Sequence, residues 1–183
     1  AANNSLSANV NFNATISNFE VLSLSDTGSV TMNMTNLDSI GSVNTVTTVS
    51  NVFSNAAQNF TIEYLGTSTN TTINVLNAAV AGNVTDVVNI KYNAATDGAS
   101  VVQALHTIAA VETININSTT SGTIAAGDIN TLTTLTASQM QTLNIVGDTK
   151  FVITNAITTA TIQTIDGSAS TGGITYSAAA GSG

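Results

Sequence analysis

The side chains in this sequence that could do chemistry are mainly aspartates in expected turns. Carboxylate and carbonyl oxygens are the ligands that Ca²⁺ prefers, roughly six to eight at a time. Glycine or asparagine stands close to each candidate, as is typical of turns. The candidate calcium ligands are Asp26, Asp86, Asp97, Asp148 and Asp166. No dense Asp-x-Asp loop is present, so a site would need ligands from neighbouring turns, and the turn preference of aspartate alone accounts for any single one.

A short motif recurs along the second half of the chain. Residues 111–116 read VETINI, residues 140–145 read MQTLNI, and residues 162–167 read IQTIDG. The copies start 29 and 22 residues apart (140 − 111 = 29; 162 − 140 = 22). A looser copy, FEVLSL, lies at 19–24. Alternating apolar and polar residues at such intervals predict one strand per turn of a stacked coil, because each strand needs a neighbour against which to bury its apolar face.

Two glutamates share the second position of this motif. They are Glu20 and Glu112, and the later copies carry Gln141 and Gln163 at the same place. Carboxylates and amides can both hydrogen-bond along a ladder of stacked strands. Glu20 and Glu112 could also bind a metal ion, which adds them to the candidate calcium ligands.

An enzymatic site is not indicated. His106 is the only histidine, cysteine is absent, and no nucleophile motif accompanies the histidine. Paired carboxylates could hydrolyse glycans, but the chain has no Arg or Trp and only three Tyr with which to hold a sugar. We therefore expect no catalytic residue and no enzyme, and a surface or partly buried structural role for His106.

Composition narrows the class of partner. The 183 residues are 43% hydrophobic but only 7% charged, against roughly a quarter in ordinary globular domains. Two lysines face ten acidic residues, giving a formal net charge of −8, so we expect no nucleic-acid partner. The apolar runs are too short to cross a bilayer. The opening segment AANNSLSANV shows no secretory signal, so we expect an intracellular protein, a fragment, or an export signal elsewhere.

Together these patterns predict an all-β protein folded as a parallel β-solenoid, of the β-helix or β-roll kind, with one or two short helical turns. The absence of proline fits strands paired on both sides. We expect one solenoid segment over 1–183, less regular at 1–100 and more regular at 101–183, and forming a fragment of a longer chain. Apolar residues at spacings of three and four predict a short helix over 99–110, and a helical turn could form near 77–81. For 128–141 a strand is favoured over a helix.

The strands themselves are predicted from period-two alternation. We expect them within 9–24, 30–34, 43–49, 60–64, 72–75, 87–92, 111–116, 142–146, 151–153, 160–162 and 174–176.

Residues 162–176, IQTIDGSASTGGITY, following the strand LNIVG at 143–147, resemble the repeat region of RTX-type, type I-secreted bacterial surface-layer proteins of the Caulobacter and Campylobacter kind. The Thr-, Asn- and Ala-rich, Cys-free composition is also similar. This resemblance implies a β-solenoid, bound Ca²⁺, a C-terminal export signal and self-association into a two-dimensional lattice on the outside of the cell. It also implies contact with surface lipopolysaccharide through another part of the chain. The family's nonapeptide G-G-x-G-x-D-x-apolar-x is nowhere complete, although Gly181-Ser182-Gly183 could begin one.

Two other functions are compatible with such a coil. One is the repeat stalk of a large bacterial adhesin or autotransporter passenger, which would be a binding module. The other is ice binding through Thr-x-Thr rows such as Thr45-Val46-Thr47 and Thr69-Asn70-Thr71. Their lack of a constant period argues against ice binding, because an ice-matching face needs regular ranks.

Overall fold

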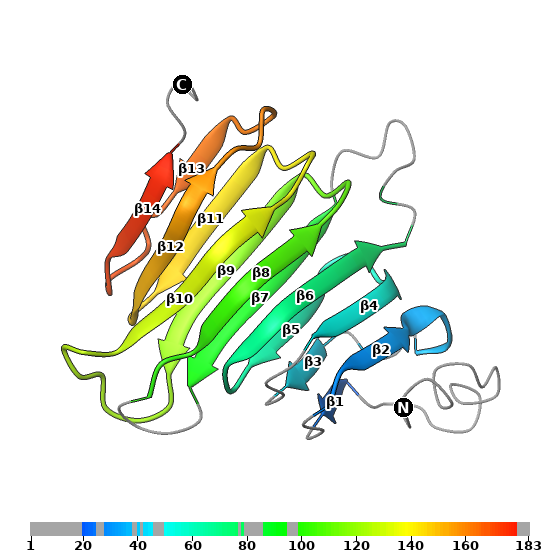
Figure 1. The fold of residues 1–183 in the computed structure, drawn as a ribbon, viewed down its shortest axis with the longest axis horizontal. Helices are drawn as coiled ribbons and strands as arrows, with labels where there is room; N and C mark the ends of the chain where they lie inside the picture. The colour runs from blue at the N-terminus through cyan, green and yellow to red at the C-terminus, as the bar shows by residue number, and fades with distance from the viewer. Residues whose placement is uncertain are drawn as a thin grey trace.

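Two parallel β-sheets packed face to face make up the computed structural model (Figure 1). The structure describes residues 20–24, 28–37, 40, 42–45, 50–76, 78, 86–94 and 99–178. In Figure 1 the colour changes steadily along the stack, from blue β1 and β2 at one end to red β14 at the other. The chain therefore advances along one axis as it coils, which confirms the predicted parallel β-solenoid.

Successive strands alternate between the two sheets, so that each coil contributes one strand to each sheet. The odd sheet contains, in spatial order, β1 (Val21–Leu24), β3 (Ser42–Thr45), β5 (Phe60–Tyr64), β7 (Val87–Ala94), β9 (Thr113–Thr120), β11 (Thr142–Gly147) and β13 (Thr164–Asp166). The even sheet contains β2 (Val30–Asn33), β4 (Asn51–Ala56), β6 (Ser68–Val75), β8 (Val102–Ile108), β10 (Ile129–Thr136), β12 (Lys150–Ile157) and β14 (Ile174–Ala178).

The pairing register of the last coils follows the repeat motif. Thr113 pairs with Thr142, and Thr142 pairs with Thr164, which are steps of 29 and 22 residues (142 − 113 = 29; 164 − 142 = 22). Near the N-terminus the step from Ser42 to Thr61 is shorter (61 − 42 = 19). Unequal coil lengths are therefore absorbed in the connections of the odd sheet, whereas in the even sheet the β4–β6 and β12–β14 pairs each contain a register shift.

The core lies between the sheets and is built from columns of similar side chains. In the odd sheet Ile62, Ile90, Ile116 and Ile145 follow one another in register, and each is at most 1% exposed. Strict alternation produces this arrangement, because every second residue of a strand faces the same side. Burying one such side chain contributes about 1.5–3 kcal/mol, so repetition of the column supplies much of the stability.

Strand β8 corrects the predicted helix over 99–110. Its inward residues include Gln103 and His106, with two successive outward residues, Ala104 and Leu105, between them. Val102 is 39% exposed. The apolar spacing of three and four arose because this strand buries polar side chains and turns some apolar ones outward, which periodicity alone cannot distinguish from a helix. The favoured strand at 128–141 is confirmed as β10.

Most of the other predicted strands are confirmed, with one clear error. Residues 160–162 form a turn, and the strand begins at Thr164. Thr159 and Thr161 use their hydroxyls to bond Ala137 O (2.9 Å) and Met140 O (2.8 Å) in the preceding coil, so these threonines fasten a connection. The part of the predicted 9–24 strand before residue 20 lies outside the described residues.

One helical turn occurs in the described part of the chain. It is the 3₁₀ turn η1 (Met34–Asn36), in which the Thr35 N–H donates to the Asn33 side chain. Most of the predicted turn at 77–81 lies outside the described residues. Within those residues, no helix is long and apolar enough to cross a membrane.

We predict that Ile114→Asp destabilises the protein by more than about 4 kcal/mol, because an unpaired charge would enter the core where Ile114 is 0% exposed. Urea unfolding followed by circular dichroism measures this. The matched control is Asn117→Asp in the same strand, where the side chain is part-exposed beside Lys91 and should change stability little. Equal stabilities of the two variants would mean that the inward face is misassigned.

Candidate functional site

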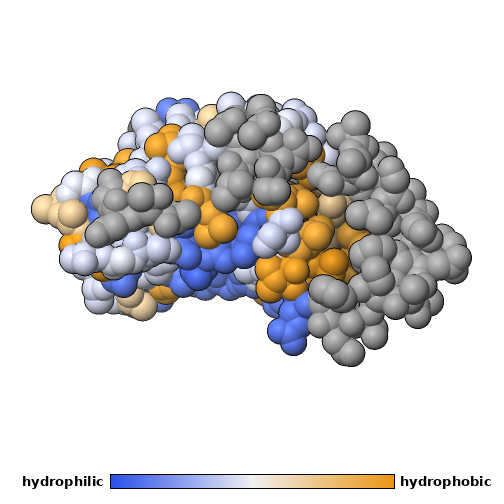
Figure 2. Space-filling view, turned by 90° about the horizontal axis from the view of Figure 1, so that it is seen from below, coloured by the Kyte–Doolittle hydropathy of each residue, from blue (hydrophilic) through white to orange (hydrophobic). Residues whose placement is uncertain are grey.

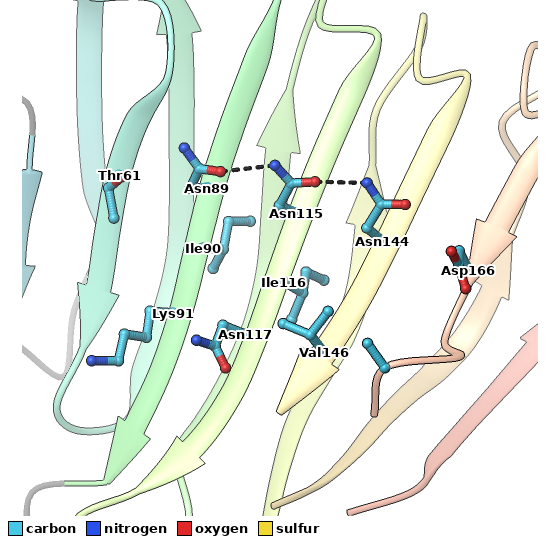
Figure 3. A pocket seen from close by; sticks show the side chains of 11 residues that line it. Thr61, Asn89, Ile90, Lys91, Asn115, Ile116, Asn117, Asn144, Val146 and Asp166 are labelled. Atoms are coloured by element: carbon cyan, nitrogen blue, oxygen red, sulfur yellow. Dashed lines mark hydrogen bonds between the residues drawn. The ribbon is translucent and has the colours of Figure 1, made fainter. Parts of the chain in front are cut away.

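A groove of about 570 Å³ runs across the outer face of the odd sheet (Figure 3). It crosses five neighbouring strands, from β5 to β13, so it lies along the solenoid axis. The lining residues are Thr61, Asn89, Ile90, Lys91, Asn115, Ile116, Asn117, Asn144, Val146, Asp166 and Ala169. Ile90 and Ile116 have buried side chains, so backbone forms that part of the floor.

A ladder of three asparagines is the central feature of the groove. Asn89, Asn115 and Asn144 pair in register on adjacent strands. Asn144 Nδ2 donates to Asn115 Oδ1 (2.8 Å), and Asn115 Nδ2 donates to Asn89 Oδ1 (2.9 Å). All the amides therefore point in one direction, as Figure 3 shows. The ladder arises because the same residue type recurs at the same strand position in three coils.

The two ends of the ladder differ. At one end Asn89 Nδ2 donates to the backbone oxygen of Asn59 (3.1 Å). At the other, Asn144 pairs in register with Asp166, whose side chain is an acceptor. The Ser168 backbone N–H donates to Asp166 Oδ1 (2.8 Å) and, with the Ser168 hydroxyl, holds the pKa of this carboxyl below its ordinary value. Asp166 is therefore ionised at neutral pH and marks the end of the ladder with a negative charge.

The lysine of the groove is paired. Lys91 Nζ lies 2.9 Å from Glu63 Oε1, which also accepts a bond from Asn93 Nδ2 (2.8 Å). Burial raises the pKa of Glu63, but the bonds from Lys91 and Asn93 outweigh it and hold this pKa below its ordinary value. The groove therefore offers amides, one hydroxyl and one carboxylate, with its cation already neutralised by a partner.

Two of the predicted metal ligands meet at one corner of the coil. Asp86 is 0% and Glu112 6% exposed, and they occupy equivalent positions just before β7 and β9. Asp86 N–H donates to Glu112 Oε2 (3.3 Å), and Gln58 Nε2 donates to Asp86 Oδ1 (2.7 Å). Sequence reasoning missed Gln58 as a member of this corner. Gln58 stands two residues before Phe60, just as Glu112 stands two before Ile114, and Phe60 and Ile114 hold equivalent positions in the stack.

The predicted motif position of the glutamates is confirmed only in part. Backbone bonds link Glu112 to Gln141 and Gln141 to Gln163 (each 2.8 Å), as the motif predicts. Glu20 does not belong to this column, because Val21 pairs with Ser42 in a register that places Glu20 two residues farther along the coil. The looser first copy was thus misaligned by two positions, and Glu20 is exposed.

The structure does not gather the remaining predicted ligands. Asp148 follows Gly147 at the end of β11 and is exposed, as is Asp166. Asp26 and Asp97 lie outside the described residues. Among the described residues, no three His, Cys, Asp or Glu side chains are grouped so as to hold a metal ion. Two carboxylates and one amide at the corner are oxygen donors of the right kind but fewer than Ca²⁺ needs, so the described residues alone form no calcium cage.

In each threonine row considered for ice binding, one described threonine faces the core. Thr45 and Thr71 are each 1% exposed and point inward. Outside the core, Thr113, Thr142 and Thr164 are in register. The sequence predicted that unequal coil lengths would prevent such ranks, and here they do not. The next outward column holds asparagines, however, and a flat Thr-x-Thr face is absent there.

Comparison with known proteins adds no relative: no protein-family model matches the sequence, and no curated protein is significantly similar to it.

His106 lies in a buried polar cluster between the two sheets. Its Nε2 is 2.8 Å from the Tyr92 hydroxyl, and its ring stacks on Tyr64 with centroids 5.3 Å apart. Tyr64 in turn donates to Thr71 Oγ1 (2.5 Å). Burial lowers the pKa of His106 to about 3. The His106 side chain is 0% exposed, so it is more deeply buried than predicted. Its contacts are with tyrosine side chains of the core.

The buried histidine predicts acid sensitivity. Its pKa is about 3 when folded against an ordinary 6.5, so the unfolded state binds the extra proton as the pH falls. The free energy of unfolding is therefore unaffected by this group above pH 6.5. It falls as the pH drops from 6.5 toward 3, by at most about 1.4 kcal/mol per pH unit. His106→Gln, which keeps an acceptor for Tyr92, should remove this pH dependence. Urea unfolding of both proteins between pH 7 and 5 measures the difference, and identical pH slopes would contradict it.

Proposed function

We propose that this chain is a structural, non-enzymatic segment of a secreted bacterial surface layer, which self-associates into a calcium-dependent two-dimensional lattice outside the cell. The observation that carries the proposal is the in-register stack of coils, which forms a stiff, extended element with two broad faces. Support also comes from the resemblance of residues 162–176 to surface-layer repeats. The same proposal assigns attachment to surface lipopolysaccharide to another part of the chain.

Lattice contacts need surfaces that another copy can recognise. Figure 2 shows hydrophilic side chains in the middle of the surface seen from below and the largest hydrophobic area toward the N-terminal coils. At the other end, Tyr176 on β14 is 45% exposed. Exposed apolar area is a feature of protein interfaces.

Calcium would act by neutralising the acidic chain. The net charge is −8, and Asp86 with Glu112 form the best-placed pair of carboxylates among the described residues. A cation at this corner would bind oxygen atoms of two carboxyl groups from adjacent coils. Further oxygen ligands would have to come from other segments or from water.

The alternative is the stalk of a large adhesin or autotransporter passenger. The specific observation in its favour is the groove on the odd sheet, because a binding module needs a recognition surface. The presence of RTX repeats in the adjoining sequence would favour the surface layer, and a membrane barrel or anchor would favour the stalk.

Calcium removal tests the proposal. We expect EGTA to lower the melting temperature and to dissolve ordered sheets seen by electron microscopy, because a ligand bound only to the folded state stabilises it. Glu112→Gln should reduce the calcium-induced shift in melting temperature, whereas Asp148→Asn, the same charge change at an exposed turn, should leave it intact.

Each part of this proposal has its own contrary result. A melting curve that is unchanged by EGTA would exclude a stabilising calcium ion in this segment. Failure to form ordered sheets at any calcium concentration would argue against lattice assembly by this segment.

A further inference from the structure

The asparagine ladder ends in two acceptors that face each other. Asn144 uses its Nδ2 to reach Asn115, which leaves Asn144 Oδ1 on the side of the next strand. That strand carries Asp166 at the paired position. Figure 3 shows the Asn144 oxygen directed toward the Asp166 carboxylate. Within the described part of the chain, no hydrogen-bond donor reaches Asn144 Oδ1.

The two adjacent acceptors are open to the groove, where water or the hydroxyl of a ligand can donate to them. Oxygen atoms with partial and full negative charge repel each other unless a hydrogen atom or a cation lies between them. Because the ladder is polarised in one direction, the amide oxygens of Asn89 and Asn115 each accept a bond from the next asparagine, and the unmet acceptor capacity collects at Asn144. A hydroxyl group donating to Asp166 or Asn144, and accepting from neither, fits this position.

The shape of the groove favours a long ligand. Neighbouring strands lie about 4.8 Å apart, so the step from one ladder residue to the next is close to the length of one sugar ring. The groove volume of about 570 Å³ is within the usual range for ligand sites. No aromatic side chain of the described residues lines the groove, so the apolar contacts that aromatic rings make with sugars in glycan-hydrolysing sites would come here from Val146 and Ala169.

Charge selects among hydroxyl-rich ligands. Lys91 is neutralised by Glu63, and Asp166 is ionised in a chain of net charge −8. An anionic polymer would meet repulsion without a free lysine in the groove to offset it. An uncharged ligand avoids this cost and still supplies hydroxyl donors.

We propose that the groove of the odd sheet binds an uncharged polysaccharide strand lying along the solenoid axis, with one sugar hydroxyl donating to the Asp166 carboxylate and a neighbouring hydroxyl donating to Asn144 Oδ1. The ladder amides of Asn89 and Asn115 contact further sugars through the N–H that each retains. This binding activity goes beyond the proposed lattice function and does not depend on it.

The variant Asp166→Asn tests the proposed hydrogen bonds from sugar hydroxyls to Asp166 and Asn144 without weakening the fold. An asparagine there can donate to Asn144 Oδ1 as Asn144 does to Asn115, so the ladder extends by one rung and the acceptor pair disappears. The matched control is Asp148→Asn, which removes an exposed carboxylate outside the groove. Linear neutral gluco- and manno-oligosaccharides long enough to span the groove are titrated calorimetrically, with EGTA present.

We expect saturable binding of one of these oligosaccharides to the wild-type protein and to Asp148→Asn. Asp166→Asn should lose about tenfold or more in affinity, because a bond to a charged acceptor is removed, and its melting temperature should equal or exceed that of the wild type. Full affinity in Asp166→Asn overturns the proposal, as does the absence of saturable binding of either oligosaccharide. Calcium binding that is lost in Asp166→Asn would also overturn it, because the gap would then hold a cation. Formation of ordered sheets is measured in a separate experiment, so failure of the lattice proposal can be distinguished from failure of the polysaccharide proposal.

Discussion

Hydrogen bonding between coils in strict register is the constraint on which the rest of this structure depends. Each strand of the middle coils is paired on both sides, and in the odd sheet each paired residue stands directly above and below a residue of equivalent position. A single shift would move an entire apolar column from the core to the surface. Isoleucine is therefore stacked on isoleucine inside, and asparagine on asparagine outside. The absence of proline is part of the same requirement, since proline would remove a ladder donor.

Register also creates the polar features of the molecule. Stacking places Asp86 against Glu112 in the next coil and the ring of Tyr64 beside that of Tyr92, so Asp86 meets a polar partner one coil away and the two tyrosines share a ring contact. Outside, it makes a one-directional amide ladder, and a ladder of that kind must end somewhere. The change from asparagine to Asp166 in the last copy sets that end and leaves acceptors where a donor is needed.

Sequence predicted the repeat and its register better than it predicted side-chain direction. The motif copies at 111–116, 140–145 and 162–167 are the paired strands that periodicity indicated, and the motif even contained the ladder, because Asn115, Asn144 and Asp166 share its fifth position. Strand β8 was misread because its buried Gln103 and His106 invert the usual pattern. The groove was not predicted, because its depth depends on how side chains from several neighbouring coils are arranged. The residue pattern of a single strand does not contain that information.

The most direct test of this account is the register itself. The chain lacks cysteine, so paired cysteines can be introduced cleanly. Thr113→Cys with Thr142→Cys should form a disulfide under mild oxidation, because in-register Cα atoms on neighbouring strands lie about 4.8 Å apart, within the range that a disulfide spans. Thr113→Cys with Asn144→Cys, two residues out of register and about 8 Å apart, should stay reduced. Cross-linking of the second pair but not the first would contradict the stacking on which the fold and groove rest.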